Sequence, residues 1–584
     1  MGLYAPMQYV LEGEWETLPV EEKSAGYRVT WKEHATLLNG RENDYTDDIN
    51  TRSNVINYLS GSSVYNPQQS GLGVPLEMTM ALHSDAGCSK TDELIGSLGI
   101  YTTDFNNGKL NAGTDRYASR DLADILLTQI QKDIYSSYSL PWTRRSMWNR
   151  NYSETRLPAT PSTIIELLSH QNFADMQLGH DPNFKFTVGR AIYKGILQFI
   201  TNQHDKEYIV QPLPVSNFAI QFGKKKNTLE LSWKGEDDPQ EPTARPREYI
   251  VYTRIGYGGF DNGTLVSKTS HTVKIEPGLV YSFKVTAVNR GGESFPSEIL
   301  SAYKAKREQG KVIIINGFDR ISGPAVVNTS DKAGFDLMQD PGVPYISNIS
   351  FCGAQTGKEG KGSLGHSGNE LEGMKIAGNT FDYPFIHGKA IQAAGKYSFV
   401  SCSDEAVENG LVTLEDYPVV DYILGLEKED PASKAYYKTF SSAMQRIMTS
   451  YCQAGGNLFV SGAYVGSDMS GTQGNREFTE KILKYGYQGS LTDKSSNQIK
   501  GLGRTITIPR LPNESSYAVP AADCIVPVDT AFPVFTYAPG NQSAGIAYKG
   551  NYRTFVLGFP FESIQSEADR ATIMAGILGF FTQK

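Results

Sequence analysis

The sequence predicts a multidomain protein in which an α/β domain, an all-β sandwich and a doubly wound α/β domain follow one another. A chain of 584 residues is too long for one hydrophobic core. The hydrophobic period also changes twice, which predicts domains over 1–208, 209–305 and 306–584. No run of about eighteen apolar residues occurs, so the sequence predicts no membrane span.

Residues 1–208 combine amphipathic helices with short apolar strands, which is typical of an α/β layer fold. Apolar side chains recur at helical spacing over 119–135 and 186–200. Between these helices, the apolar run 162–168 follows a proline and predicts a buried strand.

Between residues 209 and 305 the hydrophobic period becomes two. Apolar side chains alternate over 229–233, 249–252 and 281–287, and turn-forming residues separate these runs. With Trp233 in an early strand and Tyr281 in a late one, the segment resembles a fibronectin type III domain. The resemblance implies an all-β sandwich that serves as a spacer or docking module.

Residues 306–584 return to an α/β pattern, with a helix predicted over 435–454. Continuous apolar runs that end in small residues predict buried parallel strands at 312–315, 397–400, 419–424, 457–460 and 554–557. This layout resembles flavodoxin-like and glutamine-amidotransferase-like folds. Cys402 follows one of these strands, and His366 and His387 are expected in glycine-rich loops, but the glycines of an amidotransferase nucleophile turn are missing.

The charge balance argues against a nucleic-acid partner. The chain has 55 Lys and Arg against 63 Asp and Glu, a formal net charge of −8 that is spread without blocks. The 5 cysteines lie far apart without metal-ligand spacing, which predicts small buried hydrophobic residues rather than a disulfide framework.

Two residues of the first domain carry the predicted chemistry. His83 ends an apolar strand, where an imidazole can bind zinc or make a structural hydrogen bond. Glu166 lies inside the apolar run 162–168, where a carboxylate is costly to bury unless it pairs, binds a metal ion or moves a proton. The alternative is that Glu166 lies on the solvent face of an edge strand.

Together these segments resemble the zinc-dependent N-acetylmuramoyl-L-alanine amidase family over about residues 43–199. Residues 81–86 (ALHSDA) are similar to the strand motif whose histidine binds zinc in that family. Residues 161–167 (PSTIIEL) are similar to the segment that carries the catalytic glutamate. The resemblance implies that His83 is a Zn²⁺ ligand and that Glu166 is the catalytic residue.

The resemblance implies hydrolysis of the amide bond between N-acetylmuramic acid and L-alanine in peptidoglycan, with zinc polarising the carbonyl. Arg144, Arg145, Trp148 and Arg156 are candidates to hold an acidic peptide stem or a sugar, and the alternative is that they are ordinary surface and packing residues. The family's first two zinc ligands have no counterpart before residue 43. We therefore expect either that the domain is N-terminally incomplete or that it has lost zinc.

The order of the domains resembles that of large secreted xanthan-lyase-like proteins. It implies a periplasmic, cell-surface or secreted protein. Because the first residues show neither a charged nor an apolar signal region, we expect either that the protein stays inside the cell or that a signal segment has been removed, and the predicted chemistry favours removal. Two functions stay open: a peptidoglycan amidase, or a non-catalytic protein that binds wall fragments or another cell-surface glycan through a degenerate amidase domain. A third alternative places a hydrolase activity at Cys402. The sequence predicts no particular oligomeric state.

Overall fold

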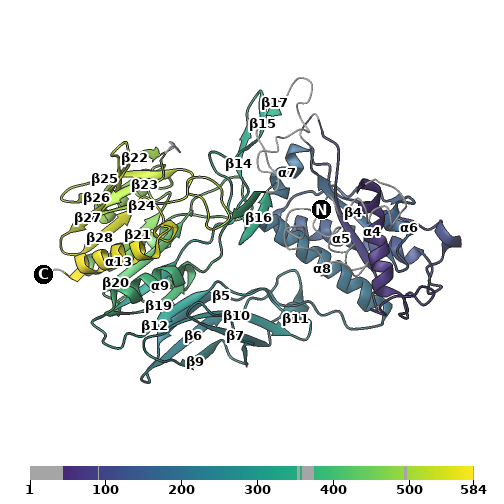
Figure 1. Ribbon diagram of the computed structural model, residues 1–584, viewed down its shortest axis with the longest axis horizontal. Helices are drawn as coiled ribbons and strands as arrows, with labels where there is room; N and C mark the ends of the chain where they lie inside the picture. The colour runs from purple at the N-terminus through teal and green to yellow at the C-terminus, as the bar shows by residue number, and fades with distance from the viewer. Residues whose placement is uncertain are drawn as a thin grey trace, which may run out of the picture. The chain divides into compact units, whose positions relative to one another are not determined.

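The computed structural model describes residues 44–89, 91, 93–350, 356–357, 374–491 and 496–582 (Figure 1). The chain divides into two compact units, which are described separately. Unit 1 contains Met1–Gly179 and Phe184–Tyr208, and unit 2 contains His180–Asn183 and Ile209–Lys584. In the described part of the chain, no helix is long and apolar enough to span a bilayer.

Unit 1 is built around a four-stranded sheet with the strand order β1-β4-β2-β3. The central strand β4 runs parallel to β1 and antiparallel to β2. The helices and strands of unit 1 are α4 (Asp44–Ser60), β1 (Thr79–Asp85), β2 (Leu98–Tyr101), α5 (Tyr117–Tyr138), β3 (Trp148–Asn149), α6 (Ser153–Arg156), β4 (Ser162–Ser169), α7 (Phe173–Gly179) and α8 (Pro182–Gln203). The two predicted helices and the predicted buried strand are confirmed as α5, α8 and β4.

Helices α5 and α8 form the core of unit 1 together with β4. Leu126 of α5, Ala191 of α8 and Ile165 of β4 are all fully buried in one cluster. Gly195 allows the two helices to approach closely, because a Cβ atom there would lie 2.9 Å from a side-chain carbon of Leu126. This core packs against β4.

The first part of unit 2 consists of two antiparallel ladders, β5-β6-β9 and β8-β7-β10-β12. Their bounds are β5 (Ser216–Phe222), β6 (Thr228–Lys234), β7 (Glu248–Ile255), β8 (Thr264–Val266), β9 (Ser270–Lys274), β10 (Val280–Asn289) and β12 (Leu300–Tyr303). Leu229, Leu231 and Trp233 alternate with more exposed residues along β6. The predicted period of two is therefore confirmed in this strand.

The second part of unit 2 contains a parallel sheet in the spatial order β19-β13-β20-β21-β28. These strands are β13 (Gly310–Asn316), β19 (Tyr397–Ser403), β20 (Val419–Gly425), β21 (Asn457–Gly462) and β28 (Arg553–Leu557). Each coincides with one of the apolar runs predicted as parallel strands, so this prediction is confirmed. Because the strands are parallel, the residues that follow them meet at one edge of the sheet.

Both faces of this parallel sheet are covered. Ile313 and Ile315 of β13 belong to the same cluster as Met444 of α11 (Ser442–Gln453). The alternate residues, Val312 and Ile314, belong to the cluster of α9 (Tyr383–Ala394) and α13 (Glu567–Thr582). Burial on both faces explains why apolar residues occur on both faces of these strands.

Some predictions for unit 2 are wrong in detail. The helix expected from residue 435 begins only at Ser442, because the Ser441 side chain accepts a hydrogen bond from the Met444 backbone N–H and caps the helix there. His387 lies in α9 rather than in a loop, and His366 lies outside the described residues.

The cysteine prediction holds for part of the set. Cys402, Cys452 and Cys524 are buried free thiols, whereas Cys88 is exposed. Cys352 lies outside the described residues. The expectation that the cysteines act as small buried hydrophobic groups is therefore wrong for Cys88, which lies beyond the end of β1.

Candidate functional site

Parallel pairing of β1 and β4 brings the two predicted catalytic residues together. His83 and Glu166 are direct partners in the register of these strands, so their side chains leave the sheet on the same face. The distance from His83 Nδ1 to Glu166 Oε1 is 3.8 Å. Because β4 pairs with β1 on one side and β2 on the other, the alternative that Glu166 lies on an edge strand is wrong.

A second carboxylate lies on the other side of the imidazole. Glu154 Oε2, from the short helix α6, is 3.1 Å from His83 Nε2. The other oxygen of Glu154 lies 3.3 Å from Nη1 of Arg52, a residue of α4. The imidazole is therefore flanked by two carboxylates, one at each ring nitrogen.

Glu154 was missed by sequence reasoning. It lies in the four-residue helix α6, two residues before Arg156, which the sequence predicts only as a ligand-binding candidate. Neither hydrophobic periodicity nor the family motifs distinguish it, since its role depends on a contact across the fold. An acidic residue close before the Glu166 strand was the one available signal.

The two carboxylates differ in electrostatic character. Burial raises the pKa of Glu166, and the charge of His83 opposes this only in part. Burial also acts to raise the pKa of Glu154, but its hydrogen bond with His83 and the charges of His83 and Arg52 outweigh burial and lower that pKa. The hydrogen bond with Glu154 in turn raises the pKa of His83. His83 and Glu154 thus form an ion pair, and Glu166 is the carboxyl group best placed to hold a proton.

Glu166 also carries an unsatisfied polar atom. Its Oε2 is buried and has no hydrogen-bond partner among the residues that the structure describes. A buried carboxylate oxygen without a partner is costly, and such positions often serve a ligand or a reaction. The atom is consistent with a carboxyl group that acts on something bound beside His83.

The four predicted ligand-binding residues separate into two pairs. Arg145 Nη1 is 2.6 Å from Asp85 Oδ2, and its guanidinium lies 5.8 Å from the centre of the half-exposed Trp148 ring. The charge of Arg145 also acts on Glu166, which connects this pair to the site. Arg144 instead forms an ion pair with Asp124 of α5, and Arg156 donates to the backbone carbonyl of Asn151.

A catalytic zinc ion takes three protein ligands and keeps one position open. His83 offers a single nitrogen to one ion, and the carboxylates of Glu154 and Glu166 lie at opposite ring nitrogens. A single ion beside His83 could therefore be bound by one histidine nitrogen and one carboxylate from the described residues of unit 1. They fit part of a zinc site and do not complete it.

The cysteine alternative in unit 2 is not favoured by the geometry. Cys402 is buried within β19, and burial raises the pKa of its thiol well above the usual range, so the reactive thiolate is disfavoured. His387 is buried between Asp421 and Glu562, at 2.9 Å and 3.2 Å. Its imidazole is thus engaged at both nitrogens by carboxylates.

Comparison with protein-family models gives no match, and comparison with curated proteins gives none either. Several solved structures resemble a small part of the chain. The twitchin kinase region from C.elegans is 19% identical over 21% of this chain and 21% of its own, with a TM-score of 0.15. A titin multidomain structure is 22% identical over 15% of this chain and 30% of its own, with a TM-score of 0.14. The extracellular region of rat CD45 is 18% identical over 16% and 49%, with a TM-score of 0.14.

Proposed function

We propose that unit 1 is a hydrolase of the N-acetylmuramoyl-L-alanine amidase class, which cleaves the amide bond between N-acetylmuramic acid and L-alanine in peptidoglycan. The observation that carries the proposal is the in-register pair of His83 and Glu166, with a raised pKa at Glu166. A carboxyl group of raised pKa can take a proton from an attacking water and return it to a leaving amine. The motif resemblance supplies the substrate class.

In this proposal each side chain has a separate role. Glu166 moves the proton, and His83 is the group beside it that would bind zinc. Zinc, when bound, would supply Lewis acidity toward the amide carbonyl. Glu154 and Arg52 hold the imidazole ring through its Nε2 side. Arg145 and Trp148 provide a cation and an aromatic face for an acidic peptide or a sugar ring.

A non-catalytic function is the second candidate, and one observation favours it. Glu154 pairs with both Arg52 and the Nε2 atom of His83, so this ring nitrogen has a protein partner without any metal ion. Such a network can be purely structural. A domain that binds cell-wall glycan without cutting it needs no more than this. We place both candidate functions at the cell surface, in the periplasm or outside the cell, where the ligand occurs.

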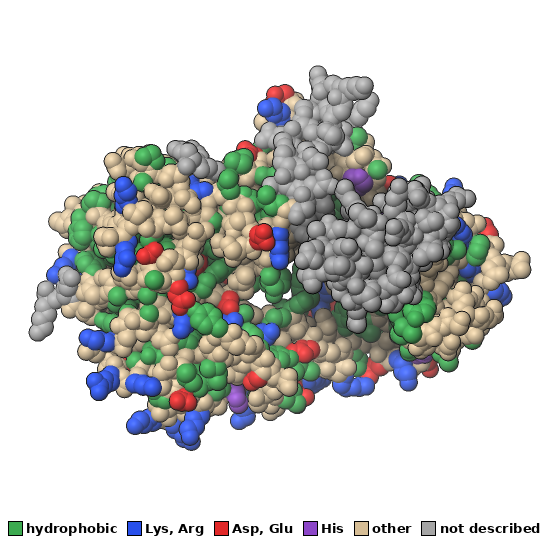
Figure 2. Space-filling view, in the orientation of Figure 1, with side chains coloured by type: hydrophobic (Ala, Val, Ile, Leu, Met, Phe, Trp, Pro, Cys, Tyr) green, Lys and Arg blue, Asp and Glu red, His purple; other side chains and the backbone are tan. Residues whose placement is uncertain are grey.

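The remaining parts are proposed to support this function. The two antiparallel ladders over 216–303 are consistent with a fibronectin type III-like spacer. The parallel order β19-β13-β20-β21-β28 is the order expected of a flavodoxin-like domain. On the face drawn in Figure 2, basic and acidic side chains are both spread over the described surface.

Digestion of purified peptidoglycan by the full chain tests the proposal, with release of free stem peptides measured by mass spectrometry. We expect Glu166→Gln to reduce release at least about 100-fold, because general acid–base groups contribute about 10²–10⁴-fold. Glu93→Gln is the matched control, since Glu93 is exposed in the same unit. Zinc removal by a chelator should abolish release, and added zinc should restore it.

Absence of stem-peptide release by the zinc-loaded wild-type protein would overturn the amidase proposal. Sedimentation of the same protein with insoluble peptidoglycan would then favour the binding function. Loss of sedimentation in an Arg145→Ala, Trp148→Ala double variant would assign that binding to this site.

A further inference from the structure

Acidic side chains gather at one edge of the parallel sheet of unit 2. Asp319 follows β13, Asp404 and Glu405 follow β19, and Glu427 follows β20. Strands β19, β13 and β20 are neighbours in the sheet, so the segments after them lie at the same edge. In open parallel α/β sheets this edge is where ligands bind.

Three of these groups are close enough to share an ion. Asp319, Asp404 and Glu405 each offer a carboxylate oxygen, and these oxygens all lie within 4.8 Å of one another. The three side chains are not all enclosed: Glu405 is exposed, and the other two are partly buried. An ion held there would therefore remain in contact with water.

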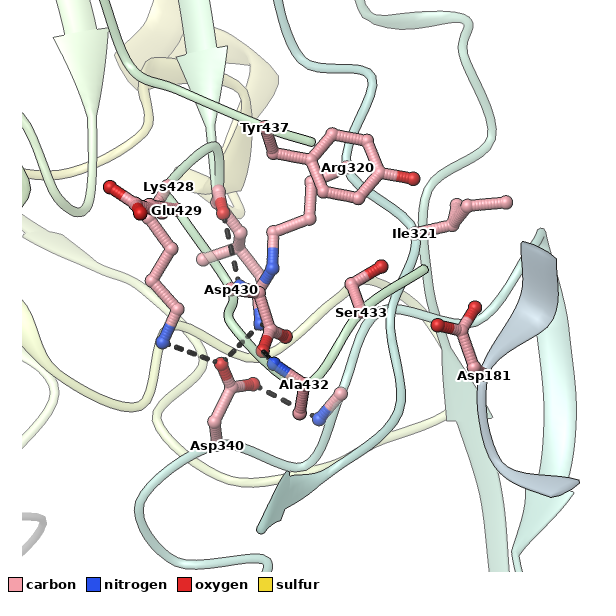
Figure 3. A network of polar contacts seen from close by, with 12 residues as sticks. Asp181, Arg320, Ile321, Asp340, Lys428, Glu429, Asp430, Ala432, Ser433 and Tyr437 are labelled. Carbon is pink, nitrogen blue, oxygen red and sulfur yellow. Dashed lines mark hydrogen bonds and ion pairs between the residues drawn. The ribbon is translucent and has the colours of Figure 1, made fainter. Parts of the chain in front are cut away.

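The loop that carries Asp319 is fixed by hydrogen bonds and ion pairs with the segment after β20. Glu427 Oε2 accepts hydrogen bonds from the backbone N–H groups of Asp319 and Arg320, at 3.0 Å and 2.8 Å. The buried Arg320 guanidinium lies 2.6 Å from Asp340, and Lys428 reaches the same carboxylate at 2.9 Å (Figure 3). Asp319 is thus preorganised by contacts that do not use its own carboxylate.

The three carboxylates of this cluster lie within reach of one another's charge, since their oxygens are within 4.8 Å of one another. Like charges at this distance are unfavourable unless a proton or a cation neutralises them.

Unsatisfied buried atoms at the same place point independently to a ligand. The fully buried Asn316, the last residue of β13, donates its Nδ2 to Glu298, and its Oδ1 has no hydrogen-bond partner among the described residues. Asn316 is the register partner of Ser403, the residue directly before Asp404, so it lies next to the cluster. Asp404 Oδ1 is likewise buried and has no partner in the part of the chain that the structure describes. A bound cation would satisfy such oxygens.

We propose that Asp319, Asp404 and Glu405 form a binding site for a hard divalent cation of the Mg²⁺ class, with the Asn316 amide as an additional oxygen donor. All the donors are oxygens, which suit Mg²⁺, Mn²⁺ and Ca²⁺ rather than zinc or copper. Mg²⁺ is the better fit, because it binds through a few carboxylates and keeps several waters. The site is distinct from the His83 site, since all its residues belong to unit 2.

Calorimetric titration of the chelator-treated full chain with MgCl₂, together with thermal unfolding, tests this site. Free Mg²⁺ at about 100 times Kd should multiply the folding equilibrium constant of the domain about 100-fold. Asp404→Asn and Glu405→Gln should each weaken Mg²⁺ binding at least about tenfold, because each removes a charged ligand. Asp416→Asn is the matched control, because Asp416 is an exposed acid of the same unit.

The apo proteins give a second readout that a purely structural cluster would not reproduce. Without cation, Asp404→Asn should unfold at a higher temperature than the wild type, because it relieves carboxylate repulsion, yet it should lose the Mg²⁺-dependent increase. Glu166→Gln should keep that increase, so failure of the amidase proposal and failure of this one are distinguishable. Absence of heat and of stabilisation with Mg²⁺, a response to Ca²⁺ only, or an unchanged response in both ligand variants would each overturn the proposal.

Discussion

At the scale of single residues, the candidate site shows how position decides the behaviour of like groups. Glu154 and Glu166 both contact His83, but their pKa values move in opposite directions. Glu154 has Arg52 and His83 as partners, whereas Glu166 has His83 at a longer distance and a buried oxygen without a partner. One carboxylate is therefore held charged, and the other is suited to carry a proton.

The first prediction at this scale concerns the His83 titration. Glu154→Gln removes the main interaction that raises the pKa of His83, so we expect this pKa to fall. The measurement is an NMR titration of histidine ring resonances in the full chain. Glu93→Gln should leave the His83 resonance unchanged. An unaltered titration in Glu154→Gln would show that the ring is not bonded to Glu154 in solution.

At the scale of elements, the loop after β13 depends on a buried ion network. Arg320 and Asp340 are both 1% exposed, and their contact is supplemented by Lys428 and Asp430 (Figure 3). These charges stabilise one another and hold the loop against the segment after β20. Burial of paired charges makes the loss of one partner costly.

We predict that Arg320→Met destabilises unit 2 by about 3 kcal/mol, because the buried Asp340 carboxylate loses its Arg320 ion pair and keeps only the Lys428 ion pair and a hydrogen bond from the Gly342 backbone N–H. Urea unfolding followed by tryptophan fluorescence measures this change. The exposed Arg307, changed to Met, is the control and should have little effect. A loss of similar size in both variants would contradict the role given to Arg320.

The elements also show what the sequence could predict and what it could not. The apolar runs at β13, β19, β20, β21 and β28 identify their strands because burial on both faces leaves few polar positions. His83 and Glu166 could be predicted as site residues because each is a polar residue in an otherwise apolar strand. Their register, the approach of Glu154 and the gathering of acids at the sheet edge arise only when distant segments pair. The start of α11 could not be predicted, because the hydrophobic pattern suggests an earlier start and a single serine is a weak signal for a helix cap.

At the scale of the whole molecule, a buried histidine connects three parts of unit 2 that lie far apart in the sequence. His387 of α9 contacts Asp421 of β20 and Glu562 near α13. Burial lowers the pKa of His387, but the two carboxylates outweigh burial and raise it to about 9. The protonated imidazole therefore helps to hold a helix against the sheet.

This network predicts how stability depends on pH. The ordinary pKa of histidine is about 6.5 in the unfolded chain, so the folded state binds this proton more tightly. The stabilisation is complete below about pH 6.5 and is lost as the pH rises through about 9. We expect unit 2 to lose up to about 3 kcal/mol over this range.

Urea unfolding across the same pH range measures this loss. His387→Gln should flatten the dependence, whereas His271→Gln, at a partly exposed position in β9, should preserve it. An equally steep dependence in His387→Gln would assign the alkaline loss to other groups.

The parallel pairing of β1 and β4 has a consequence for how this protein could diversify. His83 and Glu166 keep their spacing through neighbouring backbones, whereas Arg145, Trp148 and Glu154 lie on the long excursion between those strands. The stretch 139–161 between α5 and β4 holds these three side chains, and its length can change while β2, α5 and the His83–Glu166 pair stay in place. Under the proposed function, related chains that share the pair are expected to differ in the ligand they prefer.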